Sequence, residues 1–508
     1  MASTAGSVNR WLILVTVMIG TLMSIMDATA VNITLPYIMT SFSASVQEVK
    51  WVTTVNMLTA AATMPLTGWL GRRIGFGRLY LVALSLFVVG ATLCAISWSL
   101  ATLISFRIIQ AIGAGALQPT SMAILTRTFP PAERGRAIGI WGIGVMVGPT
   151  LGPIVGGVVT ELFSWRAAFM VNLPTGVFML MLASVTLPQE RPEGSHPLDW
   201  RGYLAFVVFI VALLLTVSEG DEYGWGSAVI HLGWGLAVAG LLLFLHIEAG
   251  EANPMMPLRL FRSLDFALAM ILSAFRSLSL FGTVFLVPLF LQRVQGRDAI
   301  DSGVMLAPGA AVLGVAMPLA GYMTDFLGGR WPTIIGIVAA TYAIAAYGVI
   351  DPLTPAWYIV WGQLFRGIGV AFIMTPVTTA GMNAISREDA GYGSWMLNLA
   401  QRYGGAASIA VLSMALERQT SVQRDLRGTA PLLAGAADPE LVHRARRLGL
   451  TRNEAVTEVM GLLRSHVSRA AATIAYQNVF IGAALVTFTG ILPALLLSSE
   501  GRARRAAG

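Results

Sequence analysis

The chain has 508 residues, of which 56% are hydrophobic and only 12% are charged, and its mean hydropathy is +0.71. This composition excludes an ordinary soluble protein and indicates a polytopic membrane protein. The net charge of +7 would suggest nucleic acid as a partner of a soluble chain, but here the arginines stand between apolar segments, so no nucleic-acid partner is expected. The single cysteine, Cys94, excludes an internal disulfide. The sequence has no metal-ligand cluster, phosphate loop or nucleophile motif, so we expect neither a cofactor nor enzymatic chemistry.

Apolar segments of membrane-spanning length recur along the whole chain. The hydrocarbon core of a bilayer is about 30 Å thick, so each spanning helix needs roughly 20 apolar residues. The first segment is too long for a signal peptide and carries Asp27. We therefore predict an all-α polytopic membrane protein with fourteen spans, at residues 11–35, 50–70, 79–97, 101–125, 137–160, 166–187, 202–218, 228–247, 265–291, 302–324, 333–350, 357–383, 392–416 and 474–497.

The arginines between the spans predict the orientation. Most of them fall on the side that holds both termini, whereas the short loops on the opposite side hold only Arg293 and Arg297. Cytoplasmic loops carry the excess of basic residues, so both termini are predicted to be cytoplasmic. Residues 417–473 carry nine arginines on the outer side, but long segments cross largely regardless of charge. This outer loop contains two helix-like stretches, 438–448 and 452–470.

Glycines recur every fourth residue in the fifth predicted span and would form one stripe on a helix. In water such a helix would be poor, because each interior Gly costs about 1 kcal/mol relative to Ala. In a bilayer, small residues at this spacing let two helix backbones approach closely. We therefore predict a tightly packed seam between moving elements, with direct ligand contact as the alternative, at Gly144, Gly148, Gly152, Pro153, Gly156 and Gly157.

A weak internal repeat divides the chain. Residues 68–78 follow the second span and residues 321–330 follow the tenth, and both are short basic turns with spaced glycines. Arg107 and Arg366 form a second pair, 259 residues apart. These offsets predict two six-span halves separated by an extra helix pair, with the boundaries 1–200, 201–262, 263–497 and a tail at 498–508.

The motifs together resemble a known family. Residues 27–36 are similar to the first-span motif of the fourteen-span drug:proton antiporters of the major facilitator superfamily, the EmrB/QacA type. Residues 68–78 match its loop motif, Arg107 and Gln110 match its fourth-span motif, and the glycine stripe matches its antiporter signature. Residues 165–176 add a fifth match. The resemblance covers nearly the whole chain, is strongest to the EmrB-like branch, and implies the major facilitator fold with two additional helices.

The resemblance also implies that the two repeated loops hold the inward side closed. The residues concerned are Gly68, Arg72, Arg73 and Gly75 in the first loop, and Gly321, Asp325 and Arg330 in the second. The family usually has an acid where Arg72 stands and a glycine where Ala111 stands. A charge relay through the loop acid is therefore expected only in the second half, at Asp325.

Ionisable residues inside predicted spans are functional candidates, because a charge in the bilayer costs several kcal/mol unless it is paired or wetted. Asp27 is the only acid well inside a span. An acid whose access to water and to an arginine changes with conformation can load a proton on one side and release it on the other. We predict Asp27 as the proton site, assisted by Arg107, with a fixed Asp–Arg clamp between helices as the alternative.

Arginines and one glutamine are predicted to line the substrate cavity. Arg107 keeps its proton at ordinary pH, so it tunes the acid, contacts the cargo or bonds carbonyls of a kinked neighbouring helix. Arg402 is either a gate or a clamp. Arg276 matches no motif: facing the cavity it would suit an amphipathic anion, whereas a local pairing would carry no such meaning. The full predicted set is Arg107, Gln110, Arg276, Arg366 and Arg402.

These features predict a proton-driven exporter of amphipathic small molecules in the cytoplasmic, or inner, membrane, acting by alternating access of its two halves. Its energy source is the proton gradient, and its partners are the substrate, protons and the lipid bilayer. The resemblance further implies a periplasmic adaptor protein and an outer-membrane channel as partners. Export of a lipid, fatty acid or endogenous metabolite is the alternative within transport, and a non-transporting membrane sensor is the alternative from another class.

Overall fold

The structure is a computed structural model that describes residues 9–188, 197–436 and 452–499, and nearly all of them are helical. The N-terminal half comprises α1 (Arg10–Phe42), α2 (Val46–Thr63), α3 (Leu66–Ile74), α4 (Phe76–Ala95), α5 (Leu100–Thr128), α6 (Arg134–Leu162), α7 (Trp165–Met170) and α8 (Asn172–Thr186). Two of its helices begin with capping boxes, which satisfy otherwise unpaired backbone N–H groups, at Ser45 with Glu48 and at Ser99 with Thr102.

A helix pair, α9 (Trp200–Tyr223) and α10 (Ala228–Gly250), separates this half from the rest. The C-terminal half then comprises η1 (Leu258–Arg262), α11 (Leu264–Arg293), α12 (Ala299–Leu327), α13 (Arg330–Ala346), η2 (Tyr347–Val349), α14 (Ala356–Asn383), α15 (Ala390–Ala436), α17 (Arg452–Thr489) and α18 (Ile491–Leu496).

Twelve candidate membrane spans are found among the described residues. They do not include the predicted spans 50–70 and 392–416. The first of these is broken between α2 and α3 at Met64 and Pro65, and Glu48 and Lys50 lower the hydropathy of α2. The second carries Arg402 and several glycines within α15. The predicted count of fourteen spans is therefore not confirmed.

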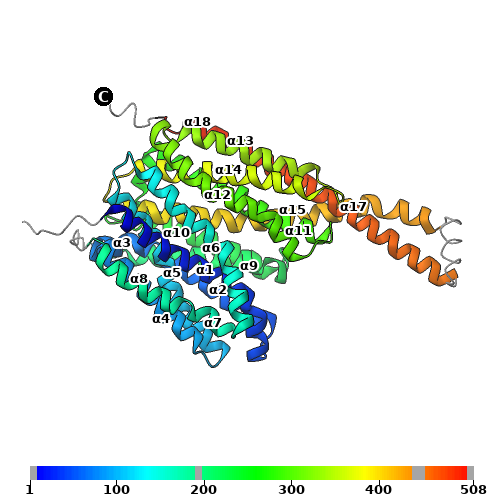
Figure 1. The fold of residues 1–508 in the computed structure, drawn as a ribbon, viewed down its shortest axis with the longest axis horizontal. Helices are drawn as coiled ribbons and strands as arrows, with labels where there is room; N and C mark the ends of the chain where they lie inside the picture. Colours follow the sequence, from blue (N-terminus) through cyan, green and yellow to red (C-terminus); the bar gives the residue numbers. More distant parts are fainter. Residues whose placement is uncertain (1–8, 189–196, 437–451, 500–508) are drawn as a thin grey trace, which may run out of the picture.

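The segment predicted as an outer loop, 417–473, is largely helical. Helix α15 continues through Ala436 and α17 begins at Arg452, so the two form an antiparallel hairpin that projects far beyond the bundle (Figure 1). The helix predicted at 452–470 is confirmed, because it is the first part of α17. The stretch predicted at 438–448 lies outside the described residues.

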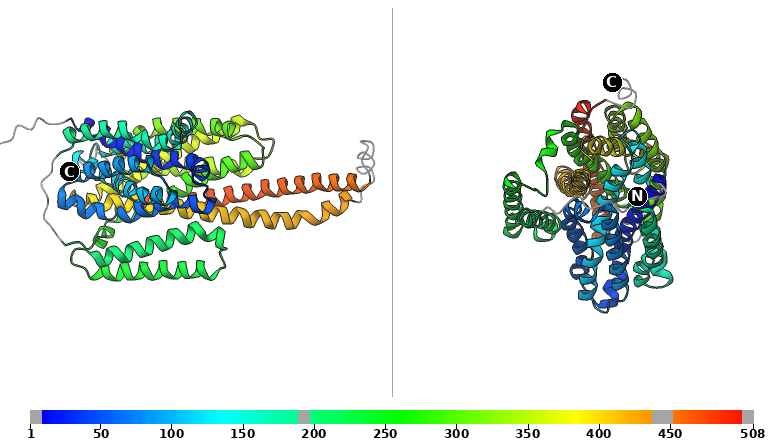
Figure 2. Two further views of the ribbon diagram at one scale, coloured as in Figure 1. Left: turned by 90° about the horizontal axis from the view of Figure 1, so that it is seen from below. Right: turned by 90° about the vertical axis from the view of Figure 1, so that its left-hand side faces the viewer.

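The two halves lie side by side with their helices roughly parallel to one long axis (Figure 1). Helix α1 begins and α18 ends at one end of the bundle, here called the terminal end. The α15–α17 hairpin projects from the opposite end, here called the hairpin end. Helices α9 and α10 form a separate pair at one side of the bundle (Figure 2). Lys50 of α2 pairs with Glu219 of α9 at 2.7 Å, which ties this pair to the N-terminal half.

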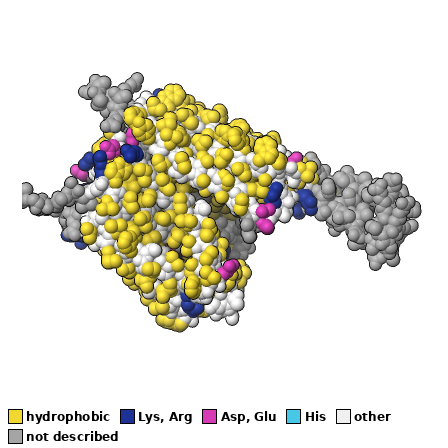
Figure 3. Space-filling view, viewed as in Figure 1, with side chains coloured by type: hydrophobic (Ala, Val, Ile, Leu, Met, Phe, Trp, Pro, Cys, Tyr) yellow, Lys and Arg dark blue, Asp and Glu magenta, His cyan; other side chains and the backbone are white. Residues whose placement is uncertain are grey.

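The halves touch near the terminal end and diverge toward the hairpin end. The Ser394 hydroxyl near the start of α15 donates to the Pro119 carbonyl of α5 at 2.9 Å. Near the start of α6, this helix packs on α12, where a methyl group at Gly139 would lie 2.5 Å from the Met317 carbonyl oxygen. The surface is hollowed between the halves at the hairpin end (Figure 3), and we call this hollow the recess.

The glycine stripe of α6 packs against α1 of the same half. A methyl group would lie 2.7 Å from Met18 at Gly144, and 2.8 Å from Ile25 at Gly148. The predicted close packing is therefore confirmed. However, the glycines that contact the other half come earlier in α6, at Gly135, Gly139 and Gly142. The predicted stripe thus sets the spacing of two helices inside one half, and a different face of α6 meets the other half.

Enlarging Gly152 should destabilise the protein. Its added methyl group would lie 2.6 Å from the Met26 carbonyl oxygen, which is backbone and cannot move aside, whereas at Gly157 the nearest atom is 3.9 Å away. Overpacking of this kind costs about 1–3 kcal/mol. Gly152→Ala should lower the melting temperature of the purified protein in a thermal-shift assay, and Gly157→Ala, the matched control, should leave it nearly unchanged. Equal melting temperatures for both variants would contradict this packing.

Candidate functional site

A buried ion pair stands at the centre of the N-terminal half. Asp27 of α1 and Arg107 of α5 are 3% and 1% exposed, and the Arg107 Nη1 lies 3.0 Å from the Asp27 Oδ2. The pair lies far from both ends of α1, because Asp27 follows the first helical residue by 17 positions, or about 26 Å. Two opposite charges at this separation neutralise each other where neither could stand alone in a bilayer.

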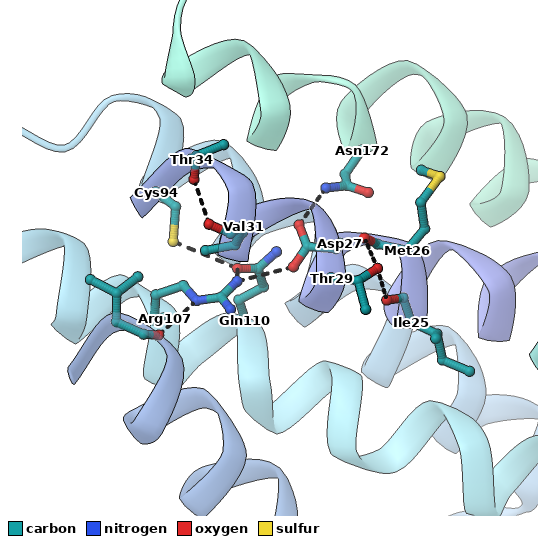
Figure 4. Close-up of polar contacts among 11 residues, drawn as sticks. Ile25, Met26, Asp27, Thr29, Val31, Thr34, Cys94, Arg107, Gln110 and Asn172 are labelled. Atoms are coloured by element: carbon teal, nitrogen blue, oxygen red, sulfur yellow. Dashed lines mark hydrogen bonds and ion pairs between the residues drawn. The ribbon is translucent and has the colours of Figure 1, made fainter. Parts of the chain in front are cut away.

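Neighbouring polar groups complete the site (Figure 4). Asn172 at the start of α8 donates to the Asp27 Oδ1 at 2.7 Å, and the Arg107 Nη1 also donates to the Gln110 Oε1 at 2.7 Å. The Arg107 Nε donates to the Val52 carbonyl of α2 at 3.3 Å. The ion pair therefore joins four helices of one half, and both carboxylate oxygens of Asp27 are occupied.

Two buried atoms beside the pair have no hydrogen-bond partner among the described residues. They are the Gln110 Nε2 and the Asn172 Oδ1. A buried polar atom left unsatisfied costs about 1–3 kcal/mol, and each of these two atoms is available for a further hydrogen bond. Asn172 was given no role by sequence reasoning. The only feature of the sequence that could have pointed to Asn172 is its position in residues 165–176. That stretch resembles the family but does not indicate which of its side chains turns inward.

Three arginines predicted to line the cavity, Arg276, Arg366 and Arg402, form no ion pair with an acid among the described residues. Arg366 donates to Gln363 on its own helix, and Arg276 donates to the Met374 carbonyl at 3.2 Å and the Thr378 hydroxyl at 3.0 Å. Both side chains are 5% exposed. Arg402 is exposed and donates to the Gln118 Oε1 at 3.3 Å. Of the arginines predicted to line a cavity, only Arg402 is open to the surroundings in this state.

Some of the predicted loop residues, Asp325 among them, lie between the halves at the terminal end. The Asp325 carboxylate accepts from the backbone N–H of Gly135 at 2.8 Å and of Arg136 at 3.0 Å, across the interface between α12 and the start of α6. The first N–H groups of a helix lack intrahelical partners and attract negative charge, which makes this contact favourable. Arg134 also crosses the interface and donates to Asn383 at 3.0 Å.

The first loop crosses the same interface. Gly68 of α3 packs against Tyr392 of α15, since a methyl group there would lie 2.7 Å from the ring, and the Arg72 guanidinium lies 5.6 Å from the centre of that ring. Gly75 has a φ of 91°, which favours glycine, and it separates α3 from α4. Arg73 stacks on Trp69 of its own helix, and Arg330 donates to the Leu497 carbonyl at 2.7 Å, so these two stay within their halves.

An all-helical bundle of two packed halves, with buried charges and apolar outer surfaces, defines a membrane transporter. Residues 17–409 match the family described as Major Facilitator Superfamily. The chain belongs to the major facilitator superfamily, and it is a transporter rather than an enzyme.

Relatives extend over most of the chain. It is 33% identical to the multidrug resistance protein Stp of Mycobacterium tuberculosis (strain ATCC 25618 / H37Rv), over 80% of this chain and 76% of that protein. It is 27% identical to an uncharacterized transporter of the same superfamily, YhcA, from Bacillus subtilis (strain 168), over 96% of this chain and 93% of that protein. The fold is similar to that of the proton:xylose symporter XylE, with a TM-score of 0.59, 14% identity and coverage of 94% and 95%.

The ion pair predicts non-additive effects of its two partners. Asp27→Asn or Arg107→Gln alone leaves one buried charge without its counterion, which costs about 3–5 kcal/mol. The double variant removes both charges, so its loss in melting temperature should be clearly smaller than the sum of the single losses. Arg366→Gln is the matched control, because Arg366 has no bond to Asp27. Its loss should simply add to that of Asp27→Asn, and additivity in both series would argue against the pair.

The contact of Asp325 with α6 predicts a conformational effect. Asp325→Asn removes the negative charge and one of the two acceptor oxygens, so the terminal end should open more often. Spin labels at Arg78→Cys and Arg387→Cys, on opposite halves, should show a larger population of long distances by double electron–electron resonance. The native Cys94 is buried and will not react with the label. Glu388→Gln, which removes an exposed acid, serves as the control. An unchanged distance distribution in Asp325→Asn would show that the contact of Asp325 with α6 does not hold the terminal end closed.

Proposed function

We propose that this protein is a proton-coupled antiporter that exports amphipathic small molecules, of the fourteen-span EmrB/QacA type. The single observation that carries the proposal is Asp27, a carboxylate deep in α1 whose only ionic partner among the described residues is Arg107. A carboxylate takes up one proton, whereas the arginine stays charged at ordinary pH. Protonation of Asp27 therefore breaks the ion pair and changes the force between α1 and α5.

The surrounding groups support a site that works in two protonation states. When Asp27 is charged, Arg107 and Asn172 each donate to one of its oxygens. When Asp27 is protonated, its hydroxyl becomes a donor, and the unpartnered Asn172 Oδ1 can accept from it after a rotation of the amide. Arg107 keeps its bonds to Gln110 and to the Val52 carbonyl meanwhile. In the protonated state Arg107 therefore has no counterion, and only the neutral Gln110 and Val52 acceptors hold its charge, which favours a rearrangement of the helices around it.

The same proposal sets the topology. We count α2 with α3 and α15 as the two further spans, because they lie alongside the other helices of the bundle (Figure 1). We place the protein in the inner membrane with both termini in the cytoplasm. This orientation agrees with the distribution of arginines between the spans. With this orientation, the halves are closed on the cytoplasmic side and the recess opens outward. The projecting α15–α17 hairpin is then the candidate surface for a periplasmic adaptor protein and an outer-membrane channel.

The proton gradient is sufficient for export. One proton crossing a potential of 100 mV releases about 2.3 kcal/mol, and each unit of pH difference adds about 1.4 kcal/mol. One proton per cycle therefore supports a gradient of roughly two to three decades for a neutral substrate. No cofactor is required beyond this gradient. The name of the relative Stp supports drugs as cargo, and export of a lipid, fatty acid or endogenous metabolite is the alternative.

Asp27→Asn should abolish uphill export. In energised inverted vesicles, wild-type protein should release protons when ethidium, chloramphenicol or fluorescein is added as a cationic, neutral or anionic probe, read by a pH-sensitive acridine dye. The Asn side chain cannot exchange a proton, so the variant should show no probe-driven release and no accumulation of probe. Glu388→Gln, which removes an exposed acid, should behave as wild type. Normal accumulation by Asp27→Asn would refute Asp27 as the proton carrier.

A further inference from the structure

Arg402 occupies an unusual position. It lies in α15, 12 residues or about 18 Å after the helix begins, and its side chain is exposed although the preceding Gln401 is buried. It donates to Gln118 of α5, which belongs to the other half, at 3.3 Å. The Ser394–Pro119 contact lies on the terminal side of this pair. Arg402 and Gln118 therefore stand where the two halves meet.

The interior of the C-terminal half carries more positive than negative charge. Arg276, Arg366 and Arg402 bond only to neutral groups, and no carboxylate of the described residues forms an ion pair with any of them. Asp27 cannot compensate them, because it is paired with Arg107 inside the other half. Cations held in a low-dielectric region without counterions create a positive potential that attracts an anion. Of the three, only Arg402 is exposed enough to meet one.

Arg276 bonds to Gln401, the residue that precedes Arg402 in α15. Its Nη2 donates to the Gln401 Oε1, and the Ser277 hydroxyl beside it donates to the Gln401 carbonyl at 2.8 Å. The Arg276 Nη1 donates to the Met374 carbonyl and to the Thr378 hydroxyl, both on α14. Arg276 thus joins α11, α14 and α15 around the residue that precedes Arg402. It is a positioning residue in this structure, and its burial keeps it from contacting a ligand beside Arg402.

We propose that Arg402 and Gln118 bind the anionic group of an amphipathic substrate, a carboxylate or a sulfonate, an inference that rests on the exporter function and specifies its substrate class. The planar guanidinium offers paired N–H donors that fit such an anion, and the Gln118 amide supplies a further donor beside it. A cationic compound of the same shape is disfavoured by like-charge repulsion. An arriving anion also replaces the contact between Arg402 and Gln118, so binding changes a bond between the two halves.

Fluorescein and rhodamine 123 test this inference, because they share a xanthene ring and differ in charge. Their binding to the full-length protein in nanodiscs of zwitterionic lipid is measured by fluorescence anisotropy, without a proton gradient. Wild-type protein should bind fluorescein at least about tenfold more tightly than rhodamine 123. Arg402→Gln should remove that preference by weakening the binding of fluorescein without weakening that of rhodamine 123, whereas Arg402→Lys should keep part of it. Arg201→Gln is the control, since it removes an exposed arginine at the start of α9.

The inference is overturned if wild-type protein shows no preference for fluorescein, or if Arg402→Gln weakens both probes equally or neither. The test is separate from that of proton coupling, because binding needs no gradient. Asp27→Asn should keep the preference for fluorescein. A protein that prefers the anion but exchanges no protons would refute the antiport mechanism and leave the anion site standing. A protein that exchanges protons but binds fluorescein and rhodamine 123 equally would refute the anion site and leave the antiport mechanism standing.

Discussion

The N-terminal half is organised around one buried ion pair. Asp27 and Arg107 join α1 to α5, while Asn172 and the Val52 carbonyl bring in α8 and α2. Neither charge is tolerable in the bilayer without the other, so the helices that carry them must stay close as long as the carboxylate is ionised. In the proposed mechanism the same carboxylate is both a structural contact and the protonation site, so uptake of a proton would loosen the contact between α1 and α5.

The two halves have similar helix arrangements but different charged groups in their interiors. Arg107 and Arg366 occupy matching helices and each bonds a glutamine three residues away, yet only Arg107 has an acidic partner. The C-terminal half instead has an exposed arginine, Arg402, at its contact with the other half, and Arg276 bonds the residue before it. The proposed proton site and the proposed anion site thus lie in different halves. Movement of one half against the other can then link the two events without direct contact between proton and cargo.

Helix α6 serves both halves through two faces. Its later glycines, from Gly144 onward, let α1 approach closely and keep Asp27 in place, whereas Gly135 and Gly139 meet α12 across the interface. Side chains on either face would separate the backbones, since added methyl groups would lie within 2.8 Å of neighbouring atoms at Gly139, Gly144, Gly148 and Gly152. Asp325 then closes the terminal end by bonding the N–H groups at the start of the same helix.

The sequence by itself determined the membrane class, most helix positions and the presence of an acid, Asp27, deep inside an apolar helix, because hydrophobic length and a charge inside an apolar span are local properties. It did not distinguish α15 as one long helix, since a polar loop and an exposed helix have similar composition. Only the tertiary structure decided which arginine pairs with Asp27, which face of α6 meets the other half, and that Arg276 is buried while Arg402 is exposed. Those outcomes depend on the rotation of each helix against neighbours far away in the chain, and sequence spacing alone does not specify that rotation.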